Sequence, residues 1–196
     1  MSPIIVGVDE AGRGPLAGPV TVAAVILKKP ISGLDDSKKL SEKKRHILEA
    51  QIIENALAFS VVHVSVETIE EINILQASLL GMQKAVQKIK HRYDEILVDG
   101  NKCPEFKQPA RAIIGGDGKV AEISAASVLA KNARDRLMVK LDKEYPQYGF
   151  AQHKGYGTKF HMQQLQKHGP CQHHRKTFAP IQQLLQLEMF GHTNIL

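Results

Sequence analysis

Short apolar runs alternate with longer amphipathic stretches along the chain, and this pattern predicts an α/β protein. Apolar, β-branched residues fill positions 4–8, 20–27 and 59–66. Runs of this length and composition are typical of β-strands. Two later apolar runs, EILVDG at 95–100 and RAIIGGDG at 111–118, are shorter and stop beside glycine. We therefore expect three early strands and two later ones.

Helical periodicity covers most of the remaining chain. Ser41 is placed to cap a helix in which apolar residues recur at helical spacing, namely Ile47, Leu48, Ile52 and Ile53. A long helix is expected over about residues 67–91, another over 119–146, and a last apolar helix near 180–187. Alternation of strands and helices favours a layered α/β structure, with the opening strands antiparallel and the later ones parallel.

Three of the apolar runs end in an aspartate: Asp9, Asp99 and Asp117. Parallel strands bring their carboxyl ends to one edge of a sheet, so these side chains should converge if the strands are neighbours. Like charges this close require a cation, and magnesium or manganese suits oxygen ligands. One aspartate beside glycine is more often a simple turn. The three together favour a metal site.

Glu10 directly follows Asp9, although neighbouring side chains of a strand point to opposite faces. We expect the strand to end at Asp9 and the chain to turn at Gly12. The longer Glu10 side chain could then reach the same metal site.

Composition narrows the class of protein. A chain of 196 residues with 43% hydrophobic and 23% charged residues is typical of one globular domain. Its net charge of +6 favours a polyanionic partner. Cys103 and Cys171 form no metal or disulfide motif, which fits a reduced, cytoplasmic compartment. No apolar run approaches the ~20 residues that span a membrane, and we expect a monomer that is neither exported nor membrane-embedded.

A series of motifs gives a closer indication of identity. Between Ile5 and Phe178 the chain carries, in order, GVDEAGRGPLAGPV, DSKKLS, LVDGN, GGDG, ISAASVLAKNARDRLM, HKGYGT and HGPCQHHRKTF. Together they resemble the bacterial ribonuclease HII family, the type 2 ribonucleases H. The resemblance implies a ribonuclease H-like fold with a mixed central sheet, flanking helices and a small C-terminal helical region. It implies a catalytic core over 1–145, completed by 146–196 in one continuous unit.

The resemblance also implies an activity. Members cut the RNA strand of RNA–DNA hybrids and incise 5′ to ribonucleotides embedded in duplex DNA, in ribonucleotide removal and RNA primer processing. The family's four catalytic, metal-binding acids correspond to Asp9, Glu10, Asp99 and Asp117. Two Mg²⁺ or Mn²⁺ ions would activate a water and stabilise the leaving 3′ oxygen, leaving 3′-hydroxyl and 5′-phosphate ends. We expect Asp9 to bridge the ions, Glu10 and Asp99 to flank them, and Asp117 to be the most exchangeable ligand.

Substrate-binding residues follow from the same resemblance. Gly12, Arg13 and Gly14 correspond to the loop that reads the 2′-hydroxyl, the group that distinguishes RNA from DNA. Tyr156 resembles the tyrosine that packs on the next sugar. Without the resemblance, the Gly-x-Gly pattern at 12–14 would more often be a simple turn, and a lone tyrosine such as Tyr156 would be a core or surface residue. Ser37, Lys38 and Lys39 are expected to contact phosphates.

Other basic residues are solvated by default but could follow phosphates, and these are Lys43, Lys44, Arg45, Lys154, Lys159, Arg175 and Lys176. His173 and His174 lack metal-ligand spacing and are expected to be structural or phosphate-facing. Residues 124–131 are expected to pack the helix behind Asp117.

The end of the chain has two readings. Gln186, Leu187, Met189 and Phe190, in the stretch QLEMF, resemble a short sliding-clamp-binding peptide. Alternatively, the apolar residues around 184–189 are one side of a terminal helix that packs on the domain, and we favour this reading.

Two other functional classes remain open. Another nuclease or strand transferase of the same fold would share the acids, but not the Gly12–Gly14 loop together with Tyr156. A non-catalytic hybrid-binding module would not need four clustered acids. Type 3 relatives would be expected to carry lysine where this chain has Arg13.

Overall fold

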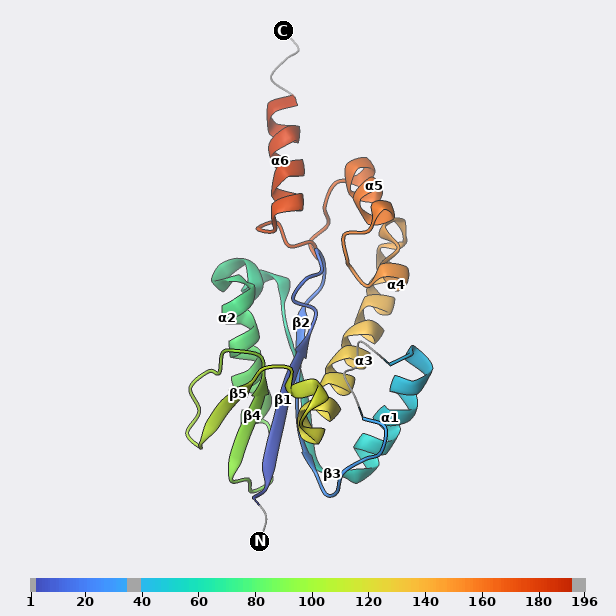
Figure 1. Ribbon diagram of the computed structural model, residues 1–196. Coiled ribbons are helices and arrows are strands. Elements are labelled where there is room, and N and C mark those ends of the chain that lie inside the picture. The colour runs from blue at the N-terminus through green and yellow to red at the C-terminus, as the bar shows by residue number, and fades with distance from the viewer. Residues whose placement is uncertain (1–2, 35–39, 192–196) are drawn as a thin grey trace.

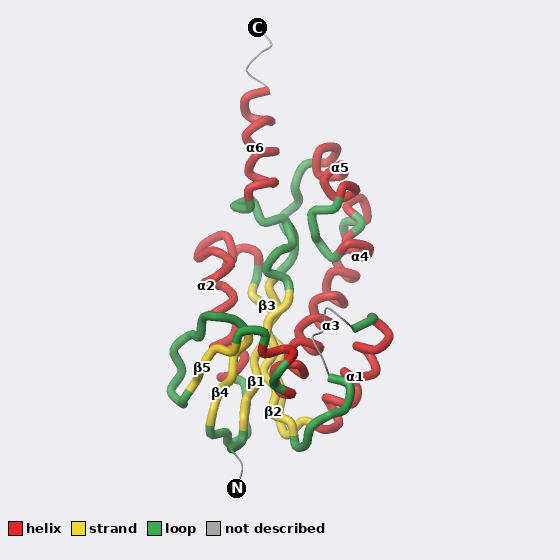
Figure 2. The backbone as a smooth tube through the Cα atoms, viewed as in Figure 1, coloured by secondary structure: helices red, strands yellow, loops and turns green. Residues whose placement is uncertain are grey.

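The sheet is mixed, as predicted. The computed structural model describes residues 3–34 and 40–191, with side chains in the last helix described as far as residue 186. Five strands lie in the order β3-β2-β1-β4-β5 (Figures 1 and 2). The antiparallel part comprises β1 (Ile5–Ala11), β2 (Val20–Leu27) and β3 (Ala56–Val64). On the other side of β1 lie β4 (Glu95–Asp99) and β5 (Ala110–Ile113), both parallel.

Helices cover both faces of this sheet. Figure 1 shows α2 (Val66–Gln87) on one side, and α1 (Glu42–Asn55) and α3 (Ala121–Glu144) on the other. All residues of β2 are buried, because a central strand between two helical layers has no solvent-facing side. Side chains of β1 and β2 that face α2 form one core, and those of β2 that face α1 and α3 form a second.

The helix ends follow local chemistry, with one difference from the predicted pattern. Ser41 caps α1 by accepting a hydrogen bond from the Lys44 N–H at 3.3 Å, as expected. The long helix predicted over about 67–91 is confirmed as α2, but it ends at Gln87 and is interrupted at Asn73, which has φ 66° and ψ 165°. The Asn73 side chain accepts hydrogen bonds from the next turn and thereby caps its second part.

The chain after residue 145 is helix and loop, as predicted. It contains η2 (Pro146–Tyr148), α4 (Phe150–His153), α5 (Lys159–His168) and α6 (Ala179–Gly191). Tyr148, Phe150, Leu165 and Ile181 form a third core with Met138 of α3. Figure 1 shows α6 extending away from the rest of the molecule. Among the described residues, no helix has the length and apolar character to cross a membrane.

Candidate active site

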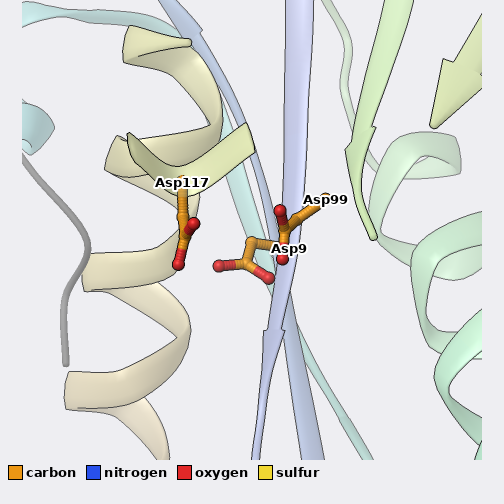
Figure 3. A group of neighbouring side chains, drawn as sticks. All are labelled: Asp9, Asp99 and Asp117. Atoms are coloured by element: carbon orange, nitrogen blue, oxygen red, sulfur yellow. The ribbon is translucent and has the colours of Figure 1, made fainter. Parts of the chain in front are cut away.

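Three carboxylates meet at the edge of the sheet, as the strand ends predict. Asp9 follows the last parallel pair between β1 and β4, Val8 with Val98. Asp99 ends β4, and Asp117 lies in η1 (Gly116–Gly118), just after β5. One ligand oxygen from each lies within 4.8 Å of the others. Figure 3 shows the three side chains turned toward one another. The predicted convergence is confirmed.

The cluster is costly without positive charge. Asp9 is 3% exposed and Asp117 is 7% exposed. Burial raises the pKa of Asp9 well above its usual value, and the charges of Glu10 and Asp99 raise it further. Hydrogen bonds from the Ser127 side chain and the Glu10 N–H oppose this rise. Three carboxylates at this spacing are a donor set for a hard divalent cation, so these residues fit Mg²⁺ or Mn²⁺.

Helix α3 and η1 hold the acids in place. The Gly116 N–H donates to Asp99 Oδ1 at 2.7 Å, and Ser124 Oγ donates to the Asp117 carbonyl at 2.6 Å. At Gly7 a Cβ would overlap the backbone at the start of α3, so glycine allows the helix to lie directly on β1. The expectation that residues 124–131 pack behind Asp117 is confirmed for Ser124.

Glu10 departs from its predicted setting. Strand β1 does not end at Asp9, because β2 continues to pair with it through Glu10 and Ala11. The expectation of a frayed strand end is therefore wrong. Glu10 lies outside the three-aspartate group, and its Oε1 is 3.4 Å from Nη1 of Arg13. It is near enough to Asp9 to be the largest charge-related cause of the raised Asp9 pKa. Its assignment as a metal ligand rests on the resemblance alone.

A pocket beside the acids collects the predicted substrate residues. Its volume is about 230 Å³, and its lining includes Glu10, the 12–14 loop, Lys131, Arg134 and Tyr156. Tyr156 is 47% exposed in a loop. A Cβ on Gly14 would lie 3.7 Å from its ring. The structure thus brings the loop and the tyrosine together, although they are far apart in the sequence.

Two buried arginines support this pocket, a role that the sequence patterns predict for neither of them. Arg134 of α3 donates to the carbonyls of Ala17, Pro19 and Lys154. Arg175 donates to the carbonyls of Gly12, Arg13 and Gly18. Burial lowers the pKa of Arg134 to about 10 and that of Arg175 to about 9.

Two of the basic residues that the sequence predicts to be solvated are buried. Arg175 was expected in a solvated or phosphate-facing group but is 0% exposed. Arg45 is also buried and bonds the Leu40 carbonyl, Asn132 and Asp135. Their charges belong to internal contacts, which a run of basic residues in the sequence does not reveal.

A chain of buried histidines fixes the backbone that carries Tyr156. The Cys171 N–H donates to Nδ1 of His174, so the proton of that ring lies on Nε2. His174 Nε2–H donates to Nε2 of His161 at 3.0 Å, and Nδ1–H of His161 then donates to the Tyr156 carbonyl at 2.9 Å. Both rings must be neutral. His174 is therefore structural, one of its two predicted roles.

Some predicted residues lie outside this description. Ser37, Lys38 and Lys39 are outside the described residues, as are the side chains of Leu187, Met189 and Phe190. Gln186 is exposed on α6, whereas Leu184 and Leu185 pack partly against the third core. The packing reading of the tail is thus confirmed for these two leucines only.

The fold and the site together define a class of protein. A mixed five-stranded sheet with three carboxylates clustered on β1, at the end of β4 and just after β5 is the architecture of a ribonuclease H-like enzyme. The family model of ribonuclease HII matches residues 6–181. The chain belongs to the ribonuclease HII family, and it is a ribonuclease H.

Individual relatives agree with this membership. Ribonuclease HII of Vibrio parahaemolyticus is 54% identical over 187 residues, covering 94% of this chain and 89% of the relative. The crystal structure of ribonuclease H2 from Pyrococcus horikoshii matches with TM-score 0.78 and 25% identity over 93% of this chain and 97% of that one. An Archaeoglobus fulgidus RNase HII, solved in complex with PCNA, matches with TM-score 0.72 and 23% identity over 92% and 96%. These matches confirm the predicted fold class.

Proposed function

We propose that this ribonuclease H hydrolyses the RNA strand of RNA–DNA hybrids and incises 5′ to single ribonucleotides in duplex DNA. The observation that carries the proposal is the position of the 12–14 loop and Tyr156 beside the carboxylate cluster. This arrangement can present one sugar to the loop while its phosphate lies at the acids. Such an activity would serve ribonucleotide removal and primer processing.

The four acids would bind the cofactor. Asp9, Asp99 and Asp117 supply clustered oxygens, and Glu10 lies next to them. Two bound Mg²⁺ or Mn²⁺ ions would activate the attacking water and stabilise the leaving 3′ oxygen. Asp9 lies on β1, which pairs with β4 and packs against α3, and it is the most buried of the three aspartates, which suits a bridging ligand. Asp117, in a short 3-10 helix, suits the exchangeable position.

Recognition of the ribonucleotide would come from backbone groups and one ring. The 2′-hydroxyl is both a donor and an acceptor, and glycine at positions 12 and 14 lets the backbone approach it closely. Tyr156 is exposed beside Gly14, where its ring can pack on the neighbouring sugar. The contacts of Arg175 with this loop support the proposal that residues 1–145 and 146–196 act as one catalytic unit.

Cleavage assays on three duplexes test the activity. The protein is incubated with Mg²⁺ or Mn²⁺ and a duplex with one ribonucleotide, a long hybrid, or DNA alone, and the product ends are mapped. We expect cuts 5′ to the ribonucleotide, leaving 3′-hydroxyl and 5′-phosphate ends. Cleavage of the all-DNA duplex alone would refute the proposal.

Matched variants test the site. Asp9→Asn should abolish cleavage and Asp117→Asn should retain most of it. Asp94→Asn should behave as the native protein, because Asp94 is exposed just before β4, at the end of the strand opposite Asp99. Unchanged cleavage by Asp9→Asn would contradict the site assignment.

We also propose a sliding-clamp contact for the stretch from Gln186 to Phe190. The supporting observations are the exposed Gln186 and the extension of α6 away from the body (Figure 1). The PCNA complex of the Archaeoglobus protein is a precedent. Deletion of residues 186–196 should abolish capture by immobilised clamp while leaving cleavage of the ribonucleotide duplex intact. Undiminished capture would refute the contact.

A further inference from the structure

Arg175 lies directly beneath the loop that is proposed to read the sugar. Its guanidinium donates to the Gly12 carbonyl at 2.6 Å, to the Arg13 carbonyl at 2.9 Å, and twice to the Gly18 carbonyl, at 2.8 and 3.0 Å. The side chain is 0% exposed. Within residues 3–34 and 40–186 it forms no ion pair with an acid. Burying a cation in this way is costly, so its contacts require an explanation.

The geometry of the peptide bond supplies one. In a trans peptide the C=O and N–H groups point in opposite directions, and the described chain has no cis peptide. When Arg175 holds the carbonyls of Gly12 and Arg13, the N–H groups of the next residues, Arg13 and Gly14, must point away from it. Neither N–H donates a hydrogen bond to another group in the described part of the chain. Both residues are exposed and line the pocket with Tyr156.

We propose that Arg175 is a positioning residue for ribonucleotide recognition, because it fixes the Arg13 and Gly14 N–H groups toward the sugar and phosphate of the substrate. This inference rests on the proposed function. It adds a residue from the C-terminal region whose effect acts through the loop rather than by contact with nucleic acid.

Arginine is required at this position for a geometric reason. Its planar guanidinium spreads donors over a fork that reaches three carbonyls at once, whereas a lysine ammonium is a single point. A lysine in place of Arg175 would keep the charge but could not hold the Gly12, Arg13 and Gly18 carbonyls together. The substitution Arg175→Lys therefore separates the positioning effect from the loss of a positive charge.

The test compares affinities rather than cleavage rates. In an Asp9→Asn background with Mg²⁺, fluorescence anisotropy gives the affinity for a duplex with one ribonucleotide and for the same duplex of DNA alone. We expect Arg175→Lys to lower the ratio of the two affinities about tenfold, the effect of one lost hydrogen bond. Arg136→Lys is the control and should not change the ratio, because Arg136 is an exposed residue of α3 paired with Glu49.

The measured affinities separate a failure of the proposed function from a failure of the inference about Arg175. If the Asp9→Asn protein itself binds both duplexes equally, the proposed function fails, and the inference fails with it. If it discriminates and Arg175→Lys folds with the ratio unchanged, only the inference about Arg175 is overturned.

A second measurement covers a variant that does not fold. With arginine retained at 175, the amide resonances of Arg13 and Gly14 are followed by NMR as each duplex is added to the Asp9→Asn protein. We expect both to shift more with the ribonucleotide duplex than with DNA alone. If a tightly bound ribonucleotide duplex leaves both resonances unmoved, the N–H groups do not face the substrate and the proposal is wrong.

Discussion

Replacing Gly12 with alanine should damage the protein in a way that its neighbour Gly14 does not share. Gly12 has φ +96°, and a Cβ there would overlap Nε and Cδ of Arg134 and lie 2.9 Å from its Cζ. A left-handed conformation costs an L-residue ~1–2 kcal/mol, and overpacking adds ~1–3 kcal/mol. The guanidinium cannot move aside easily because it bonds the carbonyls of Ala17, Pro19 and Lys154. Gly12→Ala should therefore lower the free energy of unfolding by ~2–5 kcal/mol.

Urea and thermal unfolding, followed by circular dichroism, measure this effect. A loss of this size corresponds to a fall in Tm of about 10 °C for a chain of this length. At Gly14 the nearest atom to a new Cβ is 3.7 Å away and φ is not positive, so Gly14→Ala should change stability by under ~1 kcal/mol. If both variants lost the same stability, or if Gly12→Ala lost almost none, the packing of Arg134 on Gly12 would not be as described.

Three further predictions concern charge. Asp9→Asn should raise the free energy of unfolding in metal-free buffer while abolishing cleavage, because burial and the charges of Glu10 and Asp99 raise the pKa of Asp9. A variant less stable than the native protein would contradict this. Saturating Mg²⁺, at about a hundred times its Kd, should stabilise the native protein by ~2.7 kcal/mol. In calorimetric scans, Mg²⁺ should raise the Tm of Asp9→Asn by less than it raises the Tm of the native protein. Burial lowers the pKa of His161 to about 4 and of His174 to about 3, against ~6.5 in the unfolded chain. In mild acid the unfolded chain therefore binds more protons than the folded protein does. As the pH falls from about 6.5 to 4, the free energy of unfolding should decrease by up to ~1.4 kcal/mol per pH unit for each ring. Equal urea midpoints at about pH 7.5 and 5.5 would contradict this.

The residues that could be predicted are those whose positions follow from local patterns. Asp9, Asp99 and Asp117 each end or follow an apolar run, and parallel strands necessarily bring such ends together. The length of β1 could not be read in the same way, because it depends on how far β2 continues to pair with it. The prediction that β1 ends before Glu10 is therefore wrong, although the predicted convergence of Asp9 with Asp99 and Asp117 is right.

The buried arginines show a second limit. Arg175 stands in a basic stretch, and a basic stretch is ordinarily solvated. Its partners are carbonyls of residues 12, 13 and 18, which lie more than 150 positions away in the sequence. Carbonyl acceptors carry no residue identity, so no pattern of side chains announces such a contact. Only the folded backbone identifies the arginine as part of the site.

One face of α3 connects the separate parts of the site. Ser124 bonds the Asp117 carbonyl, Ser127 bonds Asp9, Lys131 lines the pocket, and Arg134 packs against Gly12 of the loop and bonds the Ala17 carbonyl that follows it. These positions recur at intervals of three and four, which places them in one row along a helix. Ser127, which bonds Asp9, and Arg134, which packs against the loop, are about two turns or ~10 Å apart along α3. Because a helix is rigid over this length, α3 fixes the distance between the carboxylates and the sugar-reading loop. Gly7 makes this possible by letting the start of the helix lie against β1.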